Sequence, residues 1–151
     1  MAGQRRRRID ERRDPGDIPA PEADSESLTR GAVSAMLDEV LVAAHGARRA
    51  VTVVVAEARG GVATIPPSLG DVVRPHVRDT DLVWPTGPRA VTLVLVDADG
   101  PSGEVAVARI RGEVTARARL GIALGRATAA PGIQGGDLID LATANLLGLK
   151  P

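Results

Sequence analysis

From Ser27 onward, the spacing of hydrophobic residues predicts an alternating series of helices and strands. Apolar residues recur every three or four positions up to Gly46, which is typical of one face of a helix. The β-branched run at 50–58, AVTVVVAEA, predicts a buried strand. Two further apolar runs, at 81–84 and 90–96, flank a turn that contains Pro and Gly, and therefore predict a β-hairpin.

Three more helices and one more strand complete the predicted series. They are a helix over 69–77 that starts after Ser68, a helix over 104–111, a strand around 120–124 and a helix over 138–147. The resulting order is helix, strand, helix, hairpin, helix, strand, helix. This order predicts an α+β fold, in which helices cover the faces of one central mixed or antiparallel sheet.

Residues 1–25 differ from the rest of the chain, because they are rich in charge and proline and contain few large apolar side chains. Such a segment buries too little surface to offset its ordering entropy. We therefore expect a disordered arm over 1–25, followed by one domain over 26–151. The first part of the arm, MAGQRRRRIDERR, could contact nucleic acid or an acidic protein. Its interspersed acids and its lack of aromatic residues for base stacking argue against nucleic acid.

Composition narrows the possible chemistry. The chain has 151 residues, a length typical of one domain, and with one Trp and no Phe or Tyr its core must consist of Val, Leu, Ile and Ala. All but one of its 19 basic residues are Arg, which together with frequent Ala, Val, Gly and Pro suggests a GC-rich bacterial genome. The absence of Cys excludes thiol catalysis, disulfides and Cys-based metal sites.

Charge and hydropathy predict where the protein resides. The formal net charge is zero, so the molecule as a whole has no bulk attraction for polyanions. No stretch approaches the roughly 18 consecutive apolar residues of a membrane span. We expect a cytoplasmic protein that makes no contact with a membrane.

Motifs for catalysis are weak. The only histidines, His45 and His76, have no carboxylates spaced to join them in a metal site, and we interpret them as surface or helix-end residues. Asp97 and Asp99 are similar to the start of a calcium loop, but the closing Glu is missing, so a tight turn fits better. No phosphate-binding GxxxxGK[ST] or GxGxxG pattern occurs. We therefore predict no metal site and no cofactor.

Four segments of the chain together resemble a known family. They are ESLTRGAVSAML, AVTVVVAEARGG, VRDTDLVWPTGPRAVTLVLVDADGPSGEVAVARIR and RLGIALGRATAAPGIQGGDLIDLATANLLGLK. In order, they resemble the opening Asp-x-Leu-Thr helix, the first sheet strand, the signature hairpin with its flanking elements, and the final strand and helix of GGDEF domains, the diguanylate cyclases. Glu26, Leu28, Thr29 and Lys150 match conservatively. The likeness covers residues 26–151 and implies the GGDEF fold.

The resemblance also implies which parts of a cyclase site are lost. In the implied register, the Gly-Gly-Asp-Glu-Phe signature becomes Gly87-Pro88-Arg89-Ala90-Val91. The metal-binding carboxylates of the first strand become Ala56 and Ala58, and Glu57 between them points to the opposite face. The connection between Ala58 and Arg78 is shorter than in typical members, which removes the guanine-reading residues. Because Mg²⁺ needs anionic oxygens, we predict a pseudoenzyme without cyclase activity.

One family feature is retained, an Arg-x-x-Asp pattern at Arg78 and Asp81, with five residues between Asp81 and Gly87. In the family this pattern is an inhibitory site for cyclic di-GMP. An Arg guanidinium can bind guanine O6 and N7, and a carboxylate can accept from its N1 and N2. Arg74, one helical turn earlier, could assist from the same face. We therefore predict a cyclic di-GMP receptor at Arg78, Asp81 and Arg74 that signals through a protein partner or a second copy.

Other interpretations remain open. Arg78 and Asp81 could be solvated charges where a helix meets a strand. The chain could instead be a scaffold protein that binds no nucleotide and engages its partner through the Arg-rich arm or a sheet face. In a third, weaker alternative the arm binds nucleic acid and the domain only dimerises.

Overall fold

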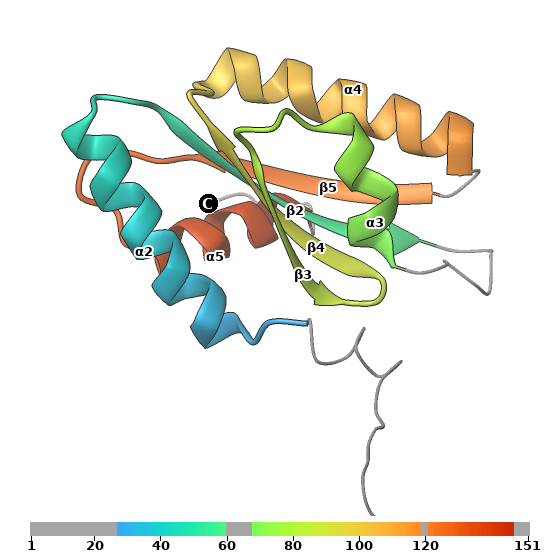
Figure 1. Ribbon diagram of the computed structural model, residues 1–151, viewed down its shortest axis with the longest axis horizontal. Helices are drawn as coiled ribbons and strands as arrows, with labels where there is room; N and C mark the ends of the chain where they lie inside the picture. The colour runs from blue at the N-terminus through green and yellow to red at the C-terminus, as the bar shows by residue number, and fades with distance from the viewer. Residues whose placement is uncertain (1–26, 60–67, 119–120, 147–151) are drawn as a thin grey trace, which may run out of the picture.

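The computed structural model describes residues 27–59, 68–118 and 121–146, whose central feature is a four-stranded antiparallel sheet (Figure 1). The strands are β2 (Val51–Arg59), β3 (Leu82–Gly87), β4 (Ala90–Val96) and β5 (Gly121–Thr128). They lie in the order β3-β4-β2-β5, and each neighbouring pair is antiparallel. The expected arm over 1–25 and the domain boundary beside it lie outside the described residues.

Helices cover both faces of this sheet (Figure 1). On one face lie α2 (Arg30–Gly46) and α5 (Gly135–Leu146); on the other lie α3 (Leu69–Val73), the short 3-10 helix η1 (Arg74–His76) and α4 (Gly100–Ala118). Successive residues of a strand point to opposite faces, so Val53 of β2 packs beneath α2 and α5, whereas Val54 packs beneath α3 and α4. The predicted α+β fold is confirmed.

Proline shortens the helix that the sequence predicts over 69–77. Helix α3 begins as expected after Ser68, whose hydroxyl accepts from the backbone N–H of Asp71 at 3.2 Å. It ends at Val73, and the chain continues through η1 to Val77, which has extended backbone angles. Pro75 causes this change, because it lacks an N–H and its ring crowds the preceding turn. The prediction is therefore wrong beyond Val73.

Helix α4 extends beyond the predicted 104–111 at both ends, and a capping residue explains its earlier start. The carboxylate of Asp99 accepts from the backbone N–H of Ser102 at 3.0 Å, and its carbonyl accepts from Gly103 N–H at 2.8 Å. This is the geometry of a helix N-cap. Hydrogen bonds from the backbone and the hydroxyl of Ser102 favour the charged carboxylate and lower the pKa of Asp99 below its ordinary value.

A glycine sets the separation between β5 and α5. A Cβ atom placed on Gly125 would lie 2.2 Å from the carbonyl oxygen of Ala142 and 2.2 Å from the backbone nitrogen of Leu146. Both atoms belong to the backbone of α5, so neither can turn aside as the tip of a side chain could. Strand β5 therefore accepts α5 at this distance only because residue 125 has no side chain.

Replacing Gly125 with alanine should destabilise the domain, because the new methyl group pushes α5 away from the sheet. We expect Gly125→Ala to lower the free energy of unfolding by about 1–3 kcal/mol, as measured by urea denaturation. Gly112→Ala is the matched control, because a methyl group at this position of α4 would meet nothing within 4 Å apart from the adjacent backbone of its own helix. It should raise the free energy of unfolding by about 0.5–1 kcal/mol. Wild-type stability in Gly125→Ala would contradict the packing described.

The Asp99 cap should make folding stability depend on pH in the acidic range. Its pKa is lower in the folded than in the unfolded chain, so its stabilising contribution is present above the unfolded pKa and is lost as the pH falls through the folded pKa. Asp99→Asn keeps an acceptor for Ser102 but removes the charge. In urea denaturation between about pH 6 and pH 3, the wild type should lose more stability than Asp99→Asn. Parallel pH profiles would refute this role.

Candidate functional site

The hairpin turn lies within the central sheet and is held by two other segments. Strands β3 and β4 are joined through Pro88 and Arg89, with an irregularity between Pro85 and Gly87. The carbonyl of Pro88 accepts from the first residue of α3, Leu69, at 2.9 Å. The carbonyl of Arg89 accepts from Ala58 of β2, also at 2.9 Å. The end of β2, the start of α3 and the turn therefore meet at one end of the molecule.

The first strand brings one buried alanine and one paired carboxylate to this meeting point. Ala56 of β2 is buried opposite Val91 of β4. Glu57 lies opposite Ala90 on the other face of the strand, with its carboxylate 3.5 Å from the guanidinium of Arg59. Within the described parts of the chain, no group of three or more His, Cys, Asp or Glu side chains is placed to hold a metal ion.

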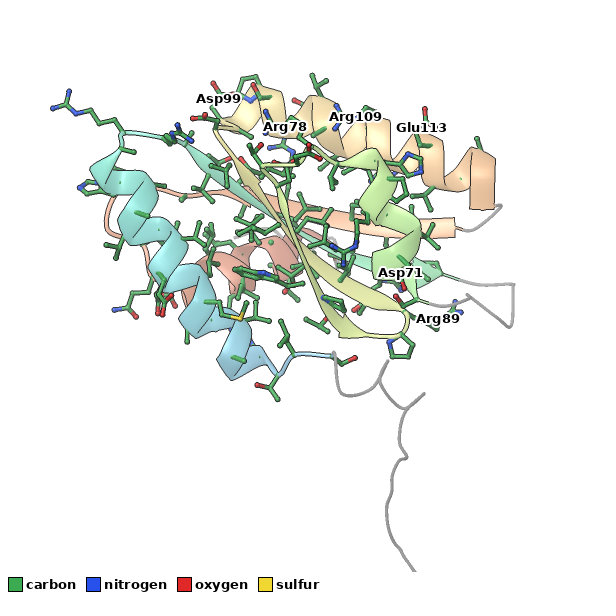
Figure 2. The ribbon with its side chains drawn as sticks, viewed as in Figure 1. Asp71, Arg78, Arg89, Asp99, Arg109 and Glu113 are labelled. Atoms are coloured by element: carbon green, nitrogen blue, oxygen red, sulfur yellow. The ribbon has the colours of Figure 1, made fainter. Side chains whose placement is uncertain are left out.

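A second carboxylate near the turn is also engaged by a neighbour. Asp71, in the first turn of α3, accepts from the hydroxyl of Ser68 at 3.0 Å. Figure 2 shows Asp71 and Arg89 at the same end of the molecule, where α3 approaches the hairpin. The turn thus presents an arginine where the implied cyclase register has its metal-binding acid.

Arg78 and Asp81 lie together just before β3 and bind each other. The Nε and Nη2 atoms of Arg78 donate to Oδ2 and Oδ1 of Asp81 at 3.3 and 3.1 Å. The backbone N–H of Arg78 also donates to Oδ2, at 3.0 Å. The side chain of Asp81 is 1% exposed and that of Arg78 is 52% exposed. The interpretation of both residues as solvated charges is therefore wrong for Asp81, which is a buried anchor.

A further hydrogen bond fixes the orientation of Arg78. Its Nη2 atom donates to the carbonyl oxygen of Val96, at the end of β4, at 2.8 Å. The guanidinium is thus held by Asp81 on one side and by the sheet on another, and half of the side chain remains accessible. Such a fixed, half-exposed guanidinium can bind a phosphate oxygen or the acceptor edge of guanine without losing much side-chain entropy.

The structure corrects the predicted position of Arg74 and adds a second arginine, Arg109. Arg74 is exposed but lies in η1, and because Val77 is extended it does not share a helical face with Arg78. No sequence pattern indicates Arg109 of α4, whose Nη2 donates to the carbonyl of His76 at 3.4 Å. Figure 2 shows Arg78 and Arg109 beside the same stretch of chain between α3 and β3. Arg109 is brought to this position by the packing of α4 against η1, which the sequence does not indicate.

The predicted surface position of the histidines agrees with the structure. His45 is exposed near the end of α2, and His76 is partly exposed in η1. Among the helices that the structure describes, none combines the length and the apolar character that crossing a bilayer requires.

Comparisons with known proteins give a consistent structural result without a sequence match. No protein-family model matches the chain, and no curated protein sequence matches it significantly. The GGDEF domain of DgcB from Caulobacter crescentus, solved in complex with c-di-GMP, superposes with a TM-score of 0.62 at 15% identity, over 81% of this chain and 84% of that chain. The active GGEEF domain of a diguanylate cyclase from Vibrio cholerae gives 0.67 at 11% identity, over 82% and 90%.

A third similar structure comes from a longer chain. The diguanylate cyclase SiaD from Pseudomonas aeruginosa, solved in complex with its activator SiaC, has a TM-score of 0.64 at 15% identity. The alignment covers 85% of this chain but 59% of SiaD. The similarity in structure thus extends over most of this chain, although the sequence identities are low. The described part of the protein therefore has the fold of GGDEF domains.

Proposed function

We propose that this protein is a catalytically inactive GGDEF-like domain that binds cyclic di-GMP around Arg78 and signals through protein contacts. The observation that carries the proposal is the Arg78 guanidinium, which is half exposed and held in one orientation at the start of the strand that leads into the hairpin. The complex of DgcB with c-di-GMP supports the choice of ligand, because DgcB has the same fold.

The proposed loss of cyclase activity follows from the charges at the hairpin. Two-metal phosphoryl chemistry needs hard anionic oxygens to hold Mg²⁺ against a triphosphate. Arg89 and Ala90 stand at the positions where the resemblance implies carboxylates, and Ala56 is a buried methyl group on the adjacent strand. A guanidinium at the turn would repel the metal rather than hold it.

The proposed ligand site combines three residues expected from the sequence with one found in the structure. Arg78 would bind a guanine edge or a phosphate, and Arg74 and Arg109 would add positive charge beside it. Asp81 would hold Arg78 in place, and would contact guanine directly only if the pair opened. Cyclic di-GMP has two guanine bases, so one molecule could bridge this site and a second copy or a protein partner.

One observation favours a second candidate function, a scaffold that recognises no nucleotide. Both oxygens of Asp81 already accept hydrogen bonds from Arg78, and the carboxylate is nearly inaccessible. In this alternative the pair only fastens the segment before β3 to the end of β4. The partner would then bind another surface, such as the arm over 1–25, which lies outside the described residues.

Cyclase activity should be absent. Purified protein incubated with GTP and Mg²⁺ should form no cyclic di-GMP, because the turn provides Arg89 instead of a metal-binding acid. An active diguanylate cyclase assayed in parallel by chromatography of the products is the positive control. Product formation that scales with the concentration of this protein would end the pseudoenzyme proposal, whatever the result of the binding experiment.

Cyclic di-GMP should bind the full chain, and the binding should depend on the fixed guanidinium of Arg78. In calorimetry, we expect Arg78→Lys to weaken binding by about tenfold or more, because lysine keeps the charge but cannot bind Asp81 and Val96 and still hold a further donor toward the ligand. Arg111→Ala, which removes an exposed arginine elsewhere on α4, should bind as the wild type does. A thermal melt of each variant separates lost binding from lost folding.

Two results would favour the scaffold hypothesis over the receptor hypothesis. One is no heat of binding at concentrations on the order of hundreds of micromolar. The other is equal affinity in the wild type and Arg78→Lys. Deleting residues 2–25 separates the two functions further, because ligand binding should survive the deletion, whereas capture of a partner through the arm should not.

A further inference from the structure

A cavity of about 610 Å³ lies at the other end of the sheet from the hairpin turn. It is partly open to solvent and is bordered by the last turns of α2, the first residues of β2 and the loop that joins β5 to α5. Its size falls in the range of about 300–1,000 Å³ that is typical of sites for small organic ligands. None of the arginines placed in the cyclic di-GMP site lines it, so it is a separate feature of the domain.

The walls of this cavity are mainly apolar. Most of the lining side chains are Ala, Val, Leu, Ile or Pro, and they include Val42 of α2 and Ile133 of the loop between β5 and α5. Val42 is 73% exposed, so much of its apolar surface is in contact with water. A ligand with an apolar body would remove this side chain from water and would gain the corresponding hydrophobic free energy.

The polar groups are divided between the two ends of the cavity. Asp38 lies at one end, where its carboxylate already accepts from the backbone N–H of Gly135 at 2.6 Å, at the start of α5. His45 and Arg49 lie at the other end. Asp38 and His45 are seven residues apart on α2, which places them about 10 Å apart along the helix axis. Gln134, which precedes Gly135 in the chain, adds an uncharged amide to the lining. The basic side chains are therefore gathered at the end away from Asp38.

The guanidinium of Arg49 is available to a ligand. Its nearest acidic partner is Asp97, but their closest atoms are 3.7 Å apart, which is longer than a hydrogen bond. Both side chains are more than half exposed, so this ion pair contributes little and can be exchanged for another anion. Arginine remains charged at physiological pH and binds carboxylate or sulfonate oxygens with two donors.

From this arrangement we infer that the cavity binds a small amphipathic organic anion, such as an aliphatic or aromatic carboxylate. The anionic group pairs with Arg49 next to His45. The apolar body lies between Val42 and Ile133 and points toward the end where Asp38 is already bound to α5. A doubly charged or wholly polar ligand would leave the apolar walls uncovered and would bring a second negative charge toward Asp38.

The inference can be tested with a matched pair of fluorescent probes and the full-length protein. Anilinonaphthalene sulfonate has an apolar body and one negative charge, and N-phenyl-1-naphthylamine has the same body without the charge. We expect saturable binding of both probes to the natively folded protein. Arg49→Gln should weaken the sulfonate by about tenfold, the typical effect of losing one charge-assisted contact, and should leave the neutral probe unchanged. Decanoate should displace the sulfonate.

Two further variants locate the binding site. Val42→Asp should weaken both probes, because it removes apolar wall and adds negative charge; since Val42 is mostly exposed, the variant should still fold. Arg111→Gln should bind both probes as the wild type does. A cooperative thermal melt excludes binding to partly unfolded protein. The inference is overturned if the sulfonate does not saturate, if Arg49→Gln binds it normally, or if Arg49→Gln weakens the neutral probe equally. None of these outcomes depends on cyclic di-GMP.

Discussion

Strand β2 is the constraint on which the rest of the fold depends. It pairs with β4 on one edge and with β5 on the other, while its side chains alternate between two separate cores. A shift by one residue would exchange the two cores and would place Glu57 where Ala56 is buried. The same pairing brings Ala58 to the turn at Arg89 and Ala50 to the backbone of Asp97. Both ends of the molecule, with their different chemistry, are therefore positioned by this one strand.

The hairpin end combines a retained framework with changed charge. Backbone hydrogen bonds from β2 and α3 fix the position of the turn. The side chain at the turn is that of Arg89, and the neighbouring positions of β2 are Ala56 and Ala58. The proposal of a binding domain without metal-dependent catalysis rests on this combination. The opposite end has an apolar cavity with Arg49 at one side, so the capacity to recognise small molecules need not reside at the hairpin.

The sequence was sufficient for the architecture because its signals there are local and repeated. The β-branched run of β2, the stripe of α2 and the hairpin around Gly87 each specify an element without help from distant residues. The errors arose at Pro75, which ends α3 early, and at Asp99, which caps α4 although the sequence suggested only a tight turn. The burial of Asp81, the approach of Arg109 and the cavity beside Arg49 arise from contacts between distant segments, and no local pattern reports them.

The closed pair of Arg78 and Asp81 has a consequence for how related chains are interpreted. The carboxylate of Asp81 holds the guanidinium of Arg78, which in turn donates to Val96 at the end of β4. Its loss would therefore harm the domain even if nothing ever bound there. Selection for folding alone can thus preserve the motif through evolution after a regulatory nucleotide has ceased to matter. Bioinformatic surveys that identify receptors by the Arg-x-x-Asp motif alone would then include proteins that bind no nucleotide. The solvent accessibility of the Asp side chain is a better criterion for a receptor than the presence of the residue.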